Sequence, residues 1–365
     1  MGQTKILVCL VFMFICMNIK MNSACMTGPT PNVSITRLIN DKGALCLDGT
    51  PPAYYLDQGE GDGINNWVIY LEGGGWCSTV EECVYRSKQN LGSSKYLKES
   101  LQFANILSKD SKTNPDFYSW NRVYIHYCDG SSYTGDVDTV NPATNITYRG
   151  GRIFNVVMED LLKRGMKNAT NAILSGSSAG GLAVVLHCDR FQSLLPTGAK
   201  VKCFSDSAYF IHEDHLRGEK QFDIVFERLI TLHGSGQMLP SFCTDIFIKP
   251  SLVKYNLSPK HHVCLVYQNC TLVEANEIEA LRLEFLDALS RGNPSSMGIW
   301  VTSCIGHDLI EGGWIPPKSN TINGNKAHPE AFGDWFYDRC AINIIDISNT
   351  SKNCTDSGIH MLPII

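Results

Sequence analysis

Residues 171–189, NAILSGSSAGGLAVVLHCD, contain the residue types and the spacing of a catalytic nucleophile. Within them GSSAG at 176–180 fits the pattern G-x-S-x-G, in which a tight strand–turn–helix presents the central serine hydroxyl. Glycine is favoured on both sides of such a turn because a Cβ atom there would collide with strand or helix. The pattern predicts Ser178 as a nucleophile, although a flexible Gly/Ser loop would contain the same five residues.

A second glycine cluster supports the catalytic interpretation. A tetrahedral oxyanion must be stabilised by backbone N–H groups. In the strand–turn–helix plan the residue after the nucleophile, here Ala179, gives one of them, and a glycine-rich loop after an earlier strand gives another. Residues 71–76, LEGGGW, are such a loop in the right chain order, and no G-K-[ST] follows that would indicate a phosphate site.

Ten histidines are candidates for the base that activates the serine. His307 comes late in the chain after an apolar run, which matches the order Ser…acid…His. The HEDH run at 212–215 lacks the i, i+4 spacing of a zinc protease, and we interpret His261 and His262 as a solvated loop. CIGH at 304–307 resembles half of a zinc site without a second half. We expect neither a metal ion nor a cofactor.

Short apolar runs alternate with helical patterns along the chain. The predicted strands lie directly before Ser178 and within residues 66–76, 121–130, 199–210 and 297–307, and the predicted helices lie directly after Ser178 and within 151–165 and 274–289. This alternation predicts an α/β fold of the α/β-hydrolase type, with a mainly parallel sheet and helices on both faces. Sites in such sheets form beyond the carboxyl ends of strands. Ser178, the glycine loop and His307 are all predicted to lie there.

The N-terminus has the pattern of a signal peptide. Lys5 precedes an apolar run at 6–17, and the small residues Ser23 and Ala24 follow. The run is shorter than the roughly 18 apolar residues of a membrane span, although a signal anchor is the alternative. We therefore expect a signal peptide at residues 1–24, a single secreted domain at 25–365, and no membrane association after the signal is removed.

The cysteines and the charge agree with secretion. Of 15 cysteines 13 follow the signal, a density that indicates disulfides and, being odd, at least one unpaired thiol. Glycosylation sequons begin at Asn32, Asn145, Asn168, Asn269, Asn349 and Asn353. The formal charge is −5, or −7 without Lys5 and Lys20 of the signal, and no basic cluster exists, so nucleic acid is excluded as a partner.

Four long blocks resemble one known family. They are residues 42–77, 114–136, 165–189 and 332–341, and together they resemble the plant pectin acetylesterases, a family that also includes the animal Notum carboxylesterase. The resemblance implies Ser178 as nucleophile, His307 as base, and N–H groups of Gly75, Trp76 and Ala179 as the oxyanion hole. It also implies a cell-wall enzyme that hydrolyses acetyl esters of pectic homogalacturonan without metal or cofactor.

The chain departs from the family at three places. Ser177 stands where the family usually has cysteine, and Asp308-Leu309 stands where it has Cys-Gln. Between an SFCT-like and an NLSP-like segment the family carries a strand that ends at the acid of the triad. Here only the eleven residues 245–255 separate the two segments, so that strand is expected to be absent.

No remaining acid is assigned to the triad. Asp245 has no strand before it, and Asp308 adjoins the histidine and cannot easily reach its Nδ1. Asp206 and Asp129 follow strands but match family positions that are interpreted as structural. Three functions therefore remain open. The first is a secreted pectin acetylesterase, and the second is a shortened variant that is weak, inactive or misfolded and at most binds wall polysaccharide. A Notum-like esterase that removes lipid is the third, and the plant-like blocks argue against it.

Overall fold

The computed structural model describes the chain between residues 32 and 353, with gaps. The described residues are 32–39, 43–140, 142–208, 221–239, 271, 276, 279–280, 283, 285–287, 298–301, 304–305, 310, 314, 327–345 and 352–353. Met1–Pro31 and Asn32–Ile365 form separate units, and everything described belongs to the second unit. The predicted signal peptide, residues 1–24, lies outside the described residues, as does the region 245–255.

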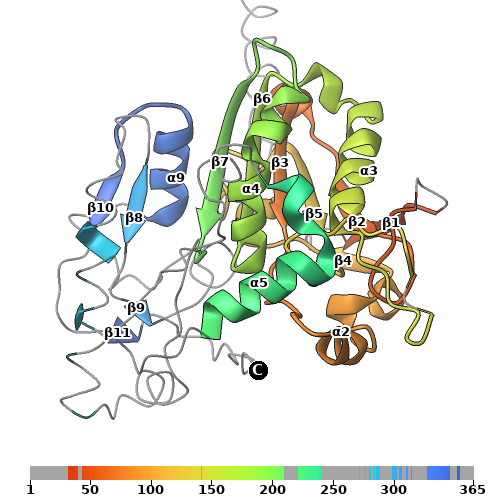
Figure 1. The fold of residues 1–365 in the computed structure, drawn as a ribbon. Coiled ribbons are helices and arrows are strands. Elements are labelled where there is room, and N and C mark those ends of the chain that lie inside the picture. Colours follow the sequence, from red (N-terminus) through yellow and green to blue (C-terminus); the bar gives the residue numbers. More distant parts are fainter. Residues whose placement is uncertain are drawn as a thin grey trace, which may run out of the picture. The chain divides into compact units, whose positions relative to one another are not determined.

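The largest sheet has seven strands in the order β4-β1-β2-β5-β3-β6-β7 (Figure 1). The strands are β1 (Asn32–Arg37), β2 (Ala53–Asp57), β3 (Asn66–Leu71), β4 (Ser100–Gln102), β5 (Asn121–Ile125), β6 (Asn171–Ser177) and β7 (Lys200–Asp206). β5, β3, β6 and β7 run parallel, which confirms the predicted parallel sheet for the strands around the candidate site. β2, β1 and β4 extend it by antiparallel pairs, which the sequence analysis did not predict.

β3 lies in the middle of this parallel group and is buried at every position. Parallel strands that are covered on both faces have continuous apolar runs instead of alternation, and NWVIYL is such a run. Its neighbour β6 is buried from residue 172 to its end. These two strands were predicted because their apolar runs stop at glycines.

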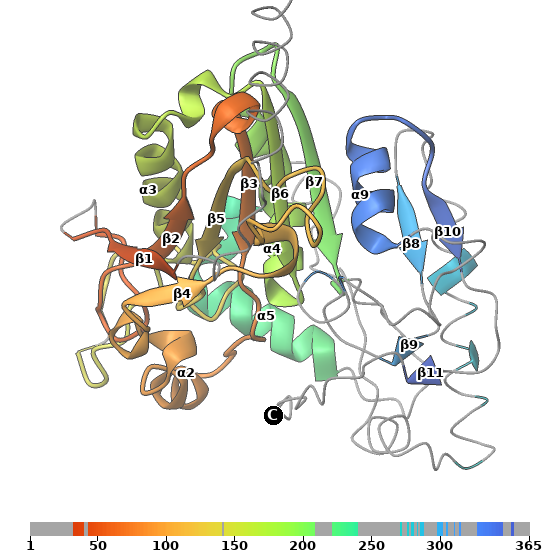
Figure 2. The same ribbon diagram turned by 180° about the vertical axis from the view of Figure 1, so that it is seen from behind.

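Helices cover both faces of the sheet, as predicted. α3 (Gly150–Lys163) and α4 (Ala179–Ser193) share one core with Ile69 and Leu71 of β3. Figure 1 shows these two helices beside the parallel strands, and Figure 2 shows the same arrangement from behind. Alternate residues of a strand point to opposite faces. Accordingly Val68 and Tyr70 belong to a second core, which includes side chains of α9 (His328–Phe336).

The predicted helix at 151–165 is confirmed together with its apolar face. Ile153, Val156, Val157 and Leu161 recur at helical spacing, and in α3 each is at most 3% exposed. Among the described residues two further helices have both ends defined, α2 (Val80–Arg86) and α5 (Gln221–His233). Short 3₁₀ helices lie at Gly61–Gly63, Asn90–Gly92, Ser94–Tyr96, Asn105–Leu107, Met166–Asn168 and Ser235–Met238.

The described strands after residue 239 are short and form separate sheets. β8 (Ile299–Val301) pairs in parallel with β10 (Asn343–Ile345), and β9 (Cys304–Ile305) pairs with β11 (Lys352–Asn353). The one strand predicted at 297–307 is therefore two strands, of which the second ends two residues before His307. Of the predicted helix 274–289, every described residue is helical.

Three disulfides join cysteines of the described residues, which confirms the prediction that the cysteine density means disulfides for these six. They are Cys46–Cys128, Cys77–Cys83 and Cys188–Cys203. The second closes the segment between the glycine loop and α2, and the third joins α4 to β7. In the described residues there is no helix with the length and apolar character needed to cross a membrane.

We predict that Phe117→Ala strongly destabilises the fold. Phe117 is 1% exposed, and its ring contacts Trp120 of the same segment and Phe332 and Phe336 of α9. Truncating a buried phenylalanine costs roughly 3–5 kcal/mol because the cavity is only partly refilled. Urea unfolding measures the loss. Tyr118→Ala is the matched control, since Tyr118 is 38% exposed, and an equal loss in both variants would contradict the packing described.

Candidate active site

Ser178 occupies a strained turn between β6 and α4. β6 ends at Ser177, α4 begins at Ala179, and Ser178 between them has φ 54° and ψ −123°. Residues other than glycine rarely adopt this conformation, and such strain is typically found at functional sites. Two backbone hydrogen bonds hold the turn: Ser178 N donates to Asp206 O at 3.0 Å, and Ser178 O accepts from Leu182 N at 3.0 Å. The predicted strand–turn–helix is therefore present, and Ser178 is half-buried at its tip.

The two glycines of the turn are required by close backbone contacts. A Cβ on Gly180 would lie 2.1 Å from Leu71 O of β3. A Cβ on Gly176 would lie 2.7 Å from Gly180 O and 2.8 Å from Leu71 O. No side chain fits at such distances, so the helix can start this close to β3 only with glycine at both positions. This excludes the alternative of an unstructured Gly/Ser loop.

The glycine loop lies directly against the serine turn. A Cβ on Gly73 would be 2.4 Å from Ser177 O and 3.0 Å from Ser178 Cβ. The next two residues, Gly74 and Gly75, have φ of 140° and 68°, which side chains rarely allow. The loop predicted from LEGGGW is thus beside the predicted nucleophile.

Ser132 joins the two halves of the site. Its Oγ accepts a hydrogen bond from Trp76 Nε1 at 2.7 Å and donates one to Ala179 O at 2.7 Å. Ala179 is the first residue of α4, where backbone N–H groups have no partner within the helix. The structure therefore brings together Ser178, Ala179, Gly75 and Trp76. Sequence reasoning missed Ser132, whose only signal is its place in a polar turn after a strand.

Ser177 and Ser178 have different surroundings although they are neighbours. Ser177 is 2% exposed, and its Oγ lies 2.6 Å from the hydroxyl of Tyr70 inside the sheet. Ser178 Oγ makes no capping bond to α4. The environment therefore favours Ser178 as the reactive hydroxyl.

Two of the four carboxylates considered for the triad can be described. Asp129 is fully buried, and its carboxylate accepts hydrogen bonds from the backbone N–H groups of Ser131 and Tyr133, which makes it the anchor of a turn. Burial raises the pKa of Asp129. Asp206 is the last residue of β7 and is 2% exposed. Its carboxylate accepts a hydrogen bond at 2.8 Å from the backbone N of Ile310, three residues beyond His307.

The remaining predicted positions cannot be placed. His307, Asp308 and Asp245 lie outside the described residues. HEDH at 212–215, His261 and His262 also lie outside the described residues. The roles of the base and of the acid therefore stay predictions.

One group of possible metal ligands occurs among the described residues. The sulfurs of Cys77 and Cys83 and a ring nitrogen of His233 lie within 4.8 Å of one another and are buried. The two sulfurs are bonded to each other, so neither is a thiolate ligand. His233 Nε2 lies 2.8 Å from Cys77 O, and burial lowers the pKa of His233 to about 4. We interpret this group as part of the core.

Comparison with known proteins identifies the family. The family model "Pectinacetylesterase" matches residues 28–253 and 245–356. Two proteins of Arabidopsis thaliana are each 38% identical to the chain. The match to pectin acetylesterase 7 covers 91% of this chain and 94% of that protein. The match to pectin acetylesterase 11 covers 86% of this chain and 89% of that protein. Palmitoleoyl-protein carboxylesterase notum2 of Xenopus laevis is 28% identical over 77% of this chain and 64% of its own.

A solved structure confirms the fold. The Wnt deacylase Notum from Drosophila superimposes with a TM-score of 0.73, and the match covers 87% of this chain and 97% of that one. The two sequences are 23% identical there, so this likeness concerns the fold. The predicted α/β-hydrolase-like architecture agrees with it.

We predict that Gly180→Ala prevents formation of the serine turn. The new Cβ would overlap Leu71 O, and relief would require α4 to move away from β3, at a cost of about 3 kcal/mol or more for overpacking of this kind. Thermal unfolding of the purified variants measures the effect. Gly198→Ala is the control, because no atom lies within 4 Å of the added Cβ there. Equal melting temperatures for the two variants would show that the contact is not tight.

Proposed function

Because the chain belongs to the pectinacetylesterase family of carboxylic ester hydrolases, we propose that it removes acetyl groups from pectic homogalacturonan with Ser178 as the nucleophile. The observation that carries the proposal is the strained Ser178 turn with the glycine loop packed against it. The relatives named pectin acetylesterase align over most of both chains, which supports pectin as the substrate.

The proposed reaction is a two-step acyl transfer. Ser178 Oγ attacks the acetyl carbonyl carbon while His307 takes its proton, and the N–H groups of Gly75, Trp76 and Ala179 stabilise the oxyanion. The bond to the sugar oxygen then breaks as His307 returns the proton to that oxygen. Water, activated by His307, next attacks the acetyl-serine, which releases acetate and restores the hydroxyl. No step requires a metal or a cofactor.

The site of action is part of the proposal. The signal-peptide pattern at 1–24, the disulfides and the sequons support a secreted protein of the plant cell wall. The charge of −7 without the signal gives no general attraction to a polyanion, so binding of pectin must come from local contacts.

We predict that Ser178→Ala abolishes nucleophilic catalysis of acetate release from acetylated pectin. What then remains is at most the oxyanion-hole contribution, ~10³ to 10⁴ over water. Ser177→Ala is the matched control, because its hydroxyl contacts Tyr70 and faces the sheet, and we expect most activity to remain. Equal rates for wild type and Ser178→Ala would refute the assignment. A series of ester chain lengths separates this function from a lipid-removing esterase, which would prefer long acyl groups.

An alternative is that this chain is a weak or inactive variant without the strand that carries the triad acid. The alignment with pectin acetylesterase 11 is 353 positions long. It includes 86% of the 365 residues of this chain, which is about 314 residues. About 39 positions of the alignment are therefore gaps in this chain. The alignment with pectin acetylesterase 7 is 371 positions long and includes 91% of this chain, so it contains a similar number of gaps in this chain. The family match is also divided into two segments, 28–253 and 245–356, which overlap in the region where the acid-bearing strand is expected to be absent.

The sheet itself supports this alternative. Among the described strands only β6 pairs with β7. β8 belongs to a separate sheet, yet Phe204 of β7 and Ile299 and Trp300 of β8 line the same apolar cavity. A strand between β7 and β8 would join the two sheets and occupy this region.

We predict that restoring the strand raises activity. Neutralising the acid of a serine-protease triad costs ~10⁴ in kcat, which corresponds to roughly 5.5 kcal/mol of barrier. A variant with a strand–Asp–Ser–Trp block inserted between Ser251 and Val253 should therefore release acetate much faster per mole of folded protein. The control is the same insertion with Asn in place of its Asp. If the natural chain is as active as the restored one, another carboxylate orients His307, and Asp206 is the first to replace.

A further inference from the structure

Two carbonyl groups of the glycine loop accept hydrogen bonds from side chains outside the loop. Arg86 of α2 donates from Nη2 to Gly74 O at 2.7 Å. The hydroxyl of Tyr127 donates to Gly75 O at 2.8 Å. Two successive peptide groups of the loop are therefore fixed, one by the last residue of α2 and the other by a residue that follows β5.

These two bonds determine where the next N–H groups point. In a planar trans peptide the C=O of one residue and the N–H of the following residue point in opposite directions. When Arg86 holds Gly74 O, the N–H of Gly75 points away from Arg86. When Tyr127 holds Gly75 O, the N–H of Trp76 points away from Tyr127. These are two of the N–H groups proposed for the oxyanion hole.

Tyr127 is itself held from several sides. Its hydroxyl accepts from Ser132 N at 2.9 Å, the Arg86 guanidinium lies 5.2 Å from its ring centre, and the ring packs 5.2 Å from that of Tyr133. Tyr127 is 0% exposed, and burial raises its pKa, so the hydroxyl keeps the proton that it donates. Ser132 is the residue whose Oγ also binds the Trp76 indole and Ala179 O.

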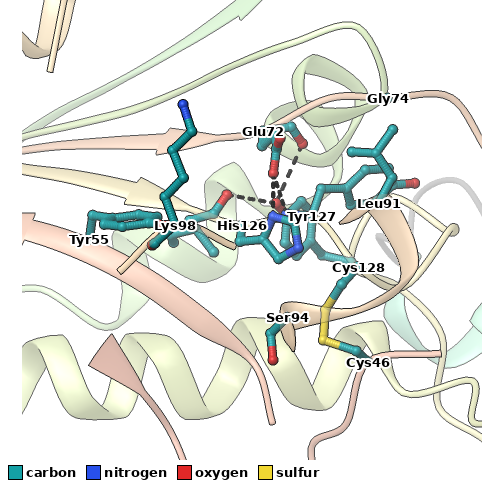
Figure 3. Close-up of polar contacts among 12 residues, drawn as sticks. Cys46, Tyr55, Glu72, Gly74, Leu91, Ser94, Lys98, His126, Tyr127 and Cys128 are labelled. Atoms are coloured by element: carbon teal, nitrogen blue, oxygen red, sulfur yellow. Dashed lines mark hydrogen bonds and ion pairs between the residues drawn. A yellow bond between two sulfur atoms is a disulfide. The ribbon is translucent and has the colours of Figure 1, made fainter. Parts of the chain in front are cut away.

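The start of the loop is anchored to the same segment (Figure 3). The carboxylate of Glu72 accepts from His126 Nδ1 at 2.7 Å and from Tyr127 N at 2.8 Å. Glu72 N donates to Ile125 O at 3.2 Å. The residues that follow β5 therefore hold the loop both before its first glycine and at Gly75.

We propose that Tyr127 is a positioning residue for the esterase reaction, which aims the Trp76 N–H at the oxyanion through its bond to Gly75 O. The inference rests on the proposed function, because it assumes an oxyanion formed at Ser178. Tyr127 touches neither the substrate nor the reacting atoms in this role. Its hydroxyl acts through the backbone of the loop, with Arg86 acting in the same way on the preceding peptide.

Tyr127→Phe tests the proposal, with Tyr55→Phe as a matched control. Tyr55 is also buried, and its hydroxyl donates to a backbone carbonyl, Lys98 O at 2.6 Å, away from the loop (Figure 3). Each variant loses one hydrogen bond from a tyrosine hydroxyl to a backbone carbonyl, so both substitutions should lower the melting temperature. Removing an oxyanion donor costs ~10² to 10³ in kcat, and misaiming one should cost about 10- to 100-fold.

The Ser178-dependent hydrolysis of p-nitrophenyl acetate is measured in the full chain, as the rate above that of Ser178→Ala. We expect Tyr127→Phe to lower kcat by that factor while KM stays within about threefold, because the bond matters in the transition state. Tyr55→Phe should keep the wild-type kcat. The affinity for a boronic acid that forms a tetrahedral adduct with the serine should fall in Tyr127→Phe alone.

Two results would overturn the inference alone, and a third would overturn the proposed function as well. A wild-type kcat in Tyr127→Phe would show that the Trp76 N–H needs no such aiming. An equal loss of kcat in Tyr55→Phe would show that the effect is general destabilisation. A wild-type rate no higher than that of Ser178→Ala would overturn the proposed function together with this inference.

Discussion

The parallel pairing of β3 with β6 is the constraint on which the candidate site depends. Leu71 is opposite Gly176 in this register, so the two strands end at the same level of the sheet. The residues that follow them, the glycine loop and the Ser178 turn, must therefore meet above the sheet. A shift of the register by one residue would separate them and would also turn every buried side chain of β3 to the wrong face. Burial of β3 on both faces fixes the register and with it the geometry of the site.

The close approach of these two segments requires unusual backbone, and the surrounding bonds keep it in place. Ser178, Ser132 and Tyr133 have φ of 54°, 55° and 58°, although none of them is glycine. Each such conformation costs of order 1–3 kcal/mol. It persists because the neighbours leave no alternative: Asp206 O holds Ser178 N, and the Asp129 carboxylate holds Tyr133 N. Strain and hydrogen bonds are concentrated around the loop and the nucleophile, where a reaction would need fixed donors.

The parts of the fold that the sequence predicted have strong local signals. β3 and β6 have apolar runs that end at glycines, and α3 has a helical apolar face. The split of 297–307 into β8 and β9 and the edge strand β4 were not predicted, since strands of two or three residues carry almost no pattern. The seven residues of β7 were predicted, but no local pattern tells which strands pair with it.

The residues of the candidate site also fall into those that the sequence could predict and those that it could not. Ser178 and the glycine loop could be found from glycine spacing, because glycine is the residue that tight backbone contacts demand. Tyr127, Ser132 and Arg86 could not, because they act across separations of 52, 47 and 12 residues through single hydrogen bonds. Disulfide pairing had no sequence signal at all, since cysteine counts do not give connectivity.

The edge of β7 opposite to β6 separates the two halves of the proposed machinery. The nucleophile and the N–H donors are built on β3, β5, β6 and α4, all on one side of β7, and their contacts do not involve a strand beyond that edge. The segment with His307 follows β9. The described residues after it contact the sheet mainly through β7, by the bond from Ile310 N to Asp206, by the Lys202 side chain on Trp335 O, and by the packing of Phe332 on Phe204. Absence of a strand next to β7 would therefore disturb the base more than the nucleophile. A chain of this kind would keep a formed serine turn and oxyanion hole and would fail in proton transfer, the step that depends on how His307 is held.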